Sequence, residues 1–142
     1  MNILLSNDHA GTELKKEIKE FLESNGYNVN NFGEDLGESV DYPDFIHPLA
    51  KEISNKKEEK GIIICGSGNG VSMVANKYEG VRAALCWNKE IASLSRQHNN
   101  ANVLSLPARF LTTDEAIEIV KTFLETDFEG GRHERRVKKI NK

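Results

Sequence analysis

The sequence predicts an α/β fold: a three-layer sandwich in which a five-stranded parallel sheet lies between helices on both faces. Short β-like apolar runs alternate five times with longer segments whose apolar residues recur at helical spacing. The clearest run, residues 61–65, is β-branched and apolar on both faces, as expected of a parallel strand buried between helices. Five successive strand-then-helix units favour a parallel sheet covered on both faces.

The first half of the chain contains two of these units. The first strand is predicted at residues 3–5, and the helix after it ends before Gly26. That helix has four apolar residues at helical spacing: Leu14, Ile18, Phe21 and Leu22. Residues 27–32 are the second predicted strand, and Pro43 fits the first turn of the next helix. The buried side of this helix is expected to comprise Ile46, Leu49, Ala50 and Ile53.

The second half contains the other three units, with strands predicted at residues 61–65, 81–87 and 102–106. A short helix after the first of these strands has three apolar residues on one side: Val71, Val74 and Ala75. The helix after the second carries Ile91, Leu94 and His98. Thr113 is the predicted N-cap of the helix after the third strand. That helix is expected to bury Ala116, Val120, Phe123 and Leu124.

The remaining segment, about residues 127–142, is basic and is predicted to form a C-terminal helical arm after Gly130 and Gly131. Val137 and Ile140 are its only apolar anchors, so we expect either a tail or an arm that packs on a partner. No internal repeat or second domain is visible. The whole chain, residues 1–142, is therefore predicted to be one domain.

Composition argues against several classes of protein. Charged residues make up 29% of the chain and the net charge is −3, which is ordinary for a globular protein. The first 130 residues contain no basic stripe of the kind that binds nucleic acid. No apolar run approaches the ~20 residues of a membrane span, and no signal peptide is visible. The two cysteines do not form a disulfide framework, so we expect a cytoplasmic protein.

Candidate functional residues follow the predicted strands, because ligands of a doubly wound sheet bind beyond the carboxyl ends of its strands. The loop after the third strand alternates glycines with polar residues: Gly66, Ser67, Gly68, Asn69 and Gly70. Such a loop can turn its amides inward as an anion nest, at the positive end of the helix that follows. Val71 and the lack of a lysine exclude the common phosphate-binding motifs. A tight turn without a ligand is the alternative.

Cys65 ends the strand next to this loop. Nearby amide donors and a helix N-terminus favour thiolate over thiol, which would make the sulfur a usable base or nucleophile. The alternative is an inert buried cysteine, an interpretation that fits Cys86 inside a strand. A redox or phosphatase enzyme is disfavoured, because the chain has no Cys-x-x-Cys pair and no arginine at position 71.

Other polar residues allow two interpretations each. Asp8 and His9 follow the first strand and could bind a ligand or cap a helix. His98 ends a helix and could act in the site or interact with the helix dipole. Arg132 and Arg136 share one helical face, spaced to grip a phosphate or simply to face solvent. The four histidines show no metal-ligand spacing, so we expect no metal site.

Six ordered segments resemble the type B ribose-5-phosphate isomerases, a family that also includes the galactose-6-phosphate isomerase subunits. They are residues 8–11, 40–44, 64–70, 75–77, 95–102 and 130–136. They run from one end of the chain to the other, so the resemblance covers essentially all of it. The resemblance implies a Rossmann-like enzyme that interconverts ribose 5-phosphate and ribulose 5-phosphate without a cofactor, in the non-oxidative branch of the pentose phosphate pathway. It also implies a homodimer, or a dimer of such dimers, with active sites between subunits.

The resemblance further implies a role for each matching residue. Cys65 is the base that moves a proton from C2 of the open-chain aldose to C1 through a cis-enediolate. The amides of residues 66–70 stabilise the enediolate oxygens, as an oxyanion hole does. His98 opens the furanose ring. The sugar is held by Asp8, His9 and Asn99, and the phosphate by Arg109, Arg132 and Arg136.

Two details refine this resemblance. Val71 stands where one branch of the family has a glutamate base, so the chain resembles the cysteine branch. The galactose-6-phosphate relatives lack the Gly-Gly-Arg-His segment of residues 130–133, which favours a five-carbon substrate. The alternatives are an isomerase of a six-carbon sugar phosphate, such as allose 6-phosphate or galactose 6-phosphate, an isomerase of an unphosphorylated pentose, or a non-catalytic sugar-phosphate-binding protein. Cys65 and His98 argue against the non-catalytic protein, because binding alone needs no thiolate.

Overall fold

The computed structural model describes residues 1–56 and 59–141 and contains one parallel sheet with strand order β2-β1-β3-β5-β4. The strands are β1 (Asn2–Asn7), β2 (Asn28–Asn31), β3 (Lys60–Cys65), β4 (Ala83–Leu85) and β5 (Val103–Pro107). The helices are α1 (Thr12–Ser24), α2 (Tyr42–Asn55), α3 (Asn69–Ala75), α4 (Lys89–Gln97), α5 (Thr113–Glu125) and α6 (Arg132–Lys138). Short 3₁₀ turns lie at η1 (His9–Gly11) and η2 (Ala108–Phe110). The predicted five-stranded parallel sheet is confirmed.

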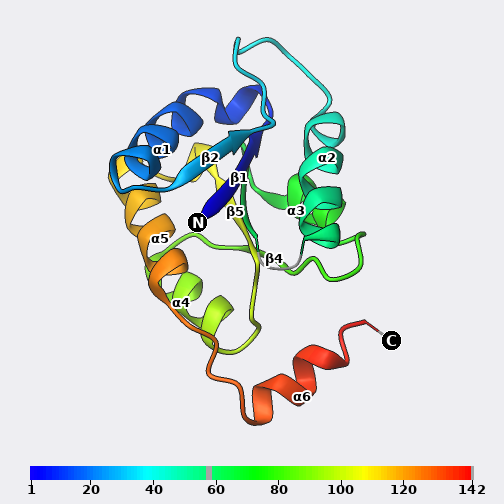
Figure 1. Ribbon diagram of the computed structural model, residues 1–142. Coiled ribbons are helices and arrows are strands. Elements are labelled where there is room, and N and C mark those ends of the chain that lie inside the picture. The colour runs from blue at the N-terminus through cyan, green and yellow to red at the C-terminus, as the bar shows by residue number, and fades with distance from the viewer. Residues whose placement is uncertain (57–58, 142) are drawn as a thin grey trace.

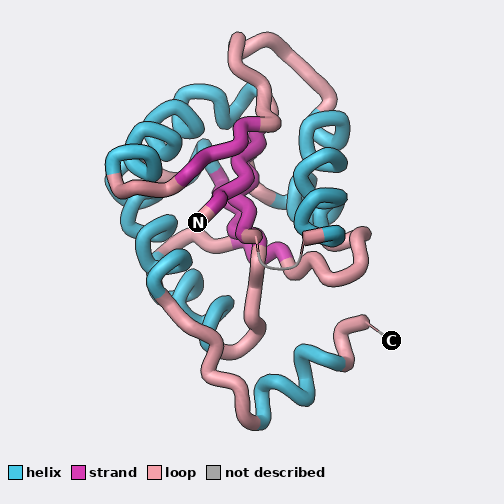
Figure 2. Tube along the Cα trace, viewed as in Figure 1, coloured by secondary structure: helices cyan, strands magenta, loops and turns pink. Residues whose placement is uncertain are grey.

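Helices cover both faces of the sheet, as predicted. Helices α1, α4 and α5 pack on one face and α2 and α3 on the other, with the strands between the two groups (Figure 2). Alternate residues of β1 show the reason: Ile3 and Leu5 join the core under α1 and α5, whereas Leu4 joins the core under α2. All three are fully buried, so β1 contributes to both cores.

The other strands begin and end within two residues of the predicted bounds, but two elements differ in ways that matter for the fold. β4 extends only over Ala83–Leu85 rather than residues 81–87, and it is an edge strand that pairs with β5 alone. The N-cap of α5 is Thr112, and the prediction of Thr113 was wrong. The Thr112 hydroxyl accepts the Glu115 amide at 3.1 Å, and the Glu115 carboxylate accepts the Thr112 amide at 2.9 Å. This capping box needs an extended cap residue, and Thr113 is already helical.

The C-terminal arm carries α6 away from the sheet, at the end of the molecule opposite the loop that joins β2 to α2 (Figure 1). None of the residues of α6 is buried, and Ile140 beyond it is 56% exposed. The arm is tied to the body at its beginning, where the Glu129 amide donates to the Gln97 carbonyl at 3.1 Å. Within residues 1–56 and 59–141, no helix combines the length and apolar character needed to cross a membrane.

Candidate active site

Three of the predicted site segments meet at the carboxyl edge of the sheet, because β1, β3 and β5 lie side by side and end together. The Asp8 amide donates to the Ile64 carbonyl at 3.2 Å, which fixes the loop after β1 beside the end of β3. The Arg109 amide donates to the Gly66 carbonyl at 3.1 Å, which fixes the turn after β5 on the other side of β3. Cys65 lies between these two loops.

The glycine loop folds back over the Cys65 sulfur. The Gly68 amide donates a hydrogen bond to Sγ of Cys65 at 3.2 Å. Gly68 has φ +77°, and a Cβ there would lie 2.4 Å from a methyl carbon of Leu85, so only glycine fits. Ser67 and Asn69 point to solvent, whereas Cys65 is only 6% exposed. The loop therefore places an amide donor on a nearly buried thiol at the rim of the sheet.

Two larger side chains cover the same loop. A Cβ on Gly66 would lie 3.1 Å from the Arg109 guanidinium, and a Cβ on Gly70 would lie 2.6 Å from the Tyr42 ring. The absence of a Cβ at each glycine therefore leaves space for the neighbouring Arg109 or Tyr42 side chain. Arg109 lies where the sequence placed it, beside the loop. Tyr42 had received no role, although it belongs to residues 40–44, one of the segments that carry the family resemblance.

Asp8 and His9 lie at this edge too, in the turn that enters α1. The Asp8 carboxylate accepts the Ala10 amide at 2.9 Å, so this residue caps the turn. The Val40 amide donates to Nδ1 of His9 at 3.2 Å, which leaves Nε2 as the protonated nitrogen of the neutral ring. His9 is thereby oriented by the loop between β2 and α2.

Buried polar groups hold that loop in place. The Glu34 carboxylate accepts the Thr12 hydroxyl at 2.6 Å and the Gly37 amide at 2.7 Å, and these hydrogen bonds lower the pKa of Glu34. Lys15, only 1% exposed, donates to the Glu34 carbonyl at 2.9 Å and pairs with the Asp35 carboxylate. The Lys15 hydrogen bond lowers the pKa of Asp35. Helix α1 thus anchors the segment that orients His9.

A second group of predicted site residues gathers around the end of α4. His98 is the C-cap of α4, and its ring stacks on that of His133 with centroids 4.3 Å apart and planes 12° apart. Oε1 of Glu129 lies 3.9 Å from Nε2 of His98 and 3.5 Å from Nε2 of His133. Burial and the nearby His98 and Arg132 charges lower the pKa of His133. Sequence reasoning missed Glu129 and His133, although their i,i+4 spacing was visible.

The arginines of the arm belong to this second group. Arg132 and Arg136 are exposed on α6, one turn apart as predicted. Asn99, also exposed, lines a hollow of about 390 Å³ between the sheet edge at β4 and the end of the arm at Ile140. Arg132, Arg136 and Asn99 therefore lie on the His98 side of the sheet and not beside Cys65.

The two groups lie at opposite ends of the strands, the Cys65 group at the carboxyl ends and the His98 group at the amino ends. Gly61 pairs with Val103 at the start of β5, and Cys65 pairs with Pro107 at its end. Four residues of strand separate these levels by about 13 Å. His98 precedes β5 and so lies on the far side of its start. Cys65 and His98 of one chain are therefore too far apart to act on the same sugar.

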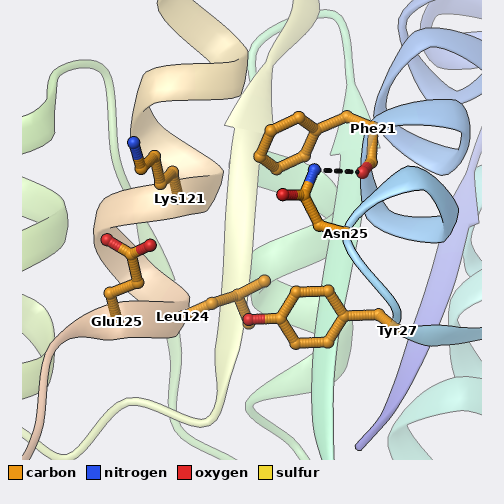
Figure 3. A pocket seen from close by; sticks show the side chains of 6 residues that line it. All are labelled: Phe21, Asn25, Tyr27, Lys121, Leu124 and Glu125. Carbon is orange, nitrogen blue, oxygen red and sulfur yellow. Dashed lines mark hydrogen bonds between the residues drawn. The ribbon is translucent and has the colours of Figure 1, made fainter.

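A further hollow, of about 240 Å³, lies between α1 and α5 (Figure 3). It is lined by Phe21, Asn25, Tyr27, Lys121, Leu124 and Glu125. The Asn25 side-chain nitrogen is used locally, since it donates to the Phe21 carbonyl at 2.8 Å. None of the predicted site residues lines this hollow, and it is not the candidate active site.

Comparisons with known proteins identify the family of the chain. The model of a family described as Ribose/Galactose Isomerase matches residues 3–140. A probable ribose-5-phosphate isomerase B of Mycoplasma genitalium is 48% identical over 141 residues, 98% of this chain and 93% of that protein. A crystal structure of the Mycoplasma genitalium enzyme with bound ribulose 5-phosphate has a TM-score of 0.95, covering 98% of this chain and 93% of that one at 48% identity. A ribose 5-phosphate isomerase of Thermotoga maritima also gives 0.95, at 46% identity, covering 99% and 97%.

Proposed function

The chain belongs to the ribose/galactose isomerase family, and we propose that it is an aldose–ketose isomerase that interconverts D-ribose 5-phosphate and D-ribulose 5-phosphate. The observation that carries this proposal is the nearly buried Cys65 thiol under the Gly68 amide, at the carboxyl edge of a sheet. The end-to-end match to a relative solved with ribulose 5-phosphate supports the choice of substrate.

The proposed reaction moves one proton between neighbouring carbons. Cys65 Sγ takes the proton from C2 of the open-chain aldose, and the electron pair of that C–H bond forms the C1=C2 bond of a cis-enediolate. The π electrons of the C1 carbonyl move onto its oxygen at the same time. The amides of residues 66–70 stabilise the charge on its oxygens. Sγ then returns the proton to C1 as C2 becomes the ketone. The hydroxyl proton of C2 leaves its oxygen and the C1 oxygen gains one, so a second proton moves from O2 to O1. The oxidation at C2 balances the reduction at C1, so the chemistry needs no redox cofactor, and we propose that it needs no metal.

The other site residues prepare this step. We propose that His98 opens the furanose ring by acid–base catalysis and that Asp8, His9 and Asn99 hold sugar hydroxyls. Arg109, Arg132 and Arg136 bind the phosphate with charge-assisted hydrogen bonds.

We also propose that the active site is shared between two copies of the chain. Its halves lie at opposite ends of the strands within one chain. Cys65 and Arg109 lie at the carboxyl ends, and His98, Arg132 and Arg136 lie beyond the amino ends. In a closed two-fold dimer, the arm of one copy can meet the carboxyl edge of its partner. The exposed arm and the hollow beside Asn99 support this arrangement. We further propose one domain over residues 1–142, a cytoplasmic location and a role in the pentose phosphate pathway.

A turnover assay with ribose 5-phosphate and allose 6-phosphate, side by side on the purified protein, tests the substrate. We expect kcat/KM to be higher for ribose 5-phosphate. A preference for allose 6-phosphate would assign the chain to a six-carbon substrate, and no turnover of either sugar would contradict the isomerase.

Replacing Arg132 or Arg136 by Ala is expected to raise KM for ribose 5-phosphate about 10- to 100-fold. The reason is that a charge-assisted hydrogen bond to phosphate contributes about 1.5–3 kcal/mol. Steady-state kinetics measure this change. Arg135→Ala is the matched control, because Arg135 is exposed on another face of α6. Equal losses in all three variants would mean that the arginines support the fold rather than the phosphate.

A further inference from the structure

The cluster of His98, Glu129 and His133 has the geometry of an open metal site. Nε2 of each histidine faces the same carboxylate oxygen, at 3.9 and 3.5 Å, and the ligand atoms all lie within 4.8 Å of one another. These separations are too long for good hydrogen bonds. Ligand atoms around a tetrahedral zinc ion, with bonds of 2.0–2.1 Å, lie about 3.4 Å apart. Small side-chain movements would therefore let an ion bind between the three groups.

The fold holds these groups together without an ion. The backbone hydrogen bond from Glu129 to Gln97 fixes the start of the arm at the end of α4, and the stacked rings pair His98 with His133. The site is also open to solvent, since the side chains of His98 and Glu129 are 42% and 51% exposed. An incoming ion could keep water as its remaining ligands.

The ligand set selects the class of ion. Two imidazoles and one carboxylate are the protein ligands of many open zinc sites, and imidazole also suits nickel, cobalt and copper. Magnesium and calcium prefer oxygen ligands throughout. We propose that His98, Glu129 and His133 bind one divalent transition-metal ion of the zinc class per chain, and that this ion inhibits the isomerase.

Inhibition is expected because the ion would bind to Nε2 of His98. Nε2 of His98 faces the cluster, and a nitrogen that is bound to a metal can neither accept nor donate the proton that opens the furanose ring. The inhibition rests on the proposed function, whereas the binding rests only on the geometry of the cluster. The two parts can therefore be tested separately.

Isothermal titration calorimetry, with Zn²⁺ added to the chelator-treated protein, tests the binding. We expect one ion per chain in the wild type and at least tenfold weaker binding in Glu129→Gln and His133→Gln. Glu134→Gln, on the same arm, and His47→Gln, an exposed histidine of α2, are matched controls that should bind as the wild type does. Cys65→Ser should also keep the site, which separates it from zinc capture by the thiol. Unchanged affinity in Glu129→Gln and His133→Gln, or loss of binding in Cys65→Ser, would overturn the proposed site.

Activity measurements test the second part. Zn²⁺ is expected to inhibit turnover of ribose 5-phosphate at the concentration at which it binds, and a chelator is expected to restore the full rate. Glu129→Gln should need at least tenfold more Zn²⁺ for the same fractional inhibition. Binding without inhibition would refute the inhibitory role, and a rate that falls on chelation would show that the ion assists catalysis. If no sugar phosphate were turned over, the titration would still decide whether the site exists.

Discussion

Cys65→Ala is expected to lower kcat for ribose 5-phosphate by about 10²–10⁴, the usual contribution of a positioned general base. The variant loses only the sulfur from a side chain at the rim of the sheet, so the fold should be retained. Steady-state kinetics, with circular dichroism to check folding, measure the effect. KM should change less than kcat, because the proposed base acts on C2 and does not hold the phosphate.

Cys86→Ala is the matched control for this loss. Cys86 is fully buried, and burial raises the pKa of its thiol to about 11, so it is a neutral packing residue near pH 7. We expect near-wild-type kcat and at most a modest loss of stability from the small cavity. Wild-type activity in Cys65→Ala, or equal losses in both variants, would contradict the assignment of Cys65 as the base.

A mixture of Cys65→Ala and His98→Ala chains, unfolded and refolded together, is expected to recover about a quarter of wild-type activity. Each variant alone should be nearly inactive. If a site combines Cys65 of one copy with His98 of the other, a mixed dimer holds one intact site and one doubly damaged site. Random pairing after joint unfolding and refolding makes about half of the dimers mixed, and each has one working site of two.

The control is the same refolding applied to each variant alone, with native mass spectrometry to count the mixed dimers. If both groups acted within one chain, every site in the mixture would lack one of them and no activity would return. Failure to recover activity in verified mixed dimers would therefore refute the shared site. It would not affect the measured turnover of the wild-type enzyme, so the isomerase itself is tested independently.

Local patterns in the sequence determined the order and type of the main elements. The apolar period identified β1, β3 and β5 and the helices between them, because a buried strand or helix face must be continuously apolar. The first and last residues of an element were predicted less accurately where tertiary contacts determine them. β4 is a short edge strand with one neighbour, and Thr112 rather than Thr113 caps α5 because its backbone is extended.

The sequence also predicted half of the candidate site. Parallel strands bring their carboxyl ends to one edge, so chain order alone placed Asp8, Cys65 and Arg109 near one another. The alternating glycines indicated a loop whose amides could face the thiol, and the Gly68 amide does so. Tyr42 was not predicted, because its contact with Gly70 depends on how α2 packs and leaves no periodic signal.

Chain order and local period therefore determined the fold class, the thiol under its glycine loop and the paired arginines of the arm. Only the tertiary structure placed Glu129 and His133 against His98, because residues distant in sequence meet only when the arm docks on the end of α4. Chain order, by contrast, already puts His98 at the opposite end of the strands from Cys65, because His98 ends the helix that leads into β5 whereas Cys65 ends β3. Periodicity describes which face of an element is buried, but the distance between two elements depends on how the whole chain packs.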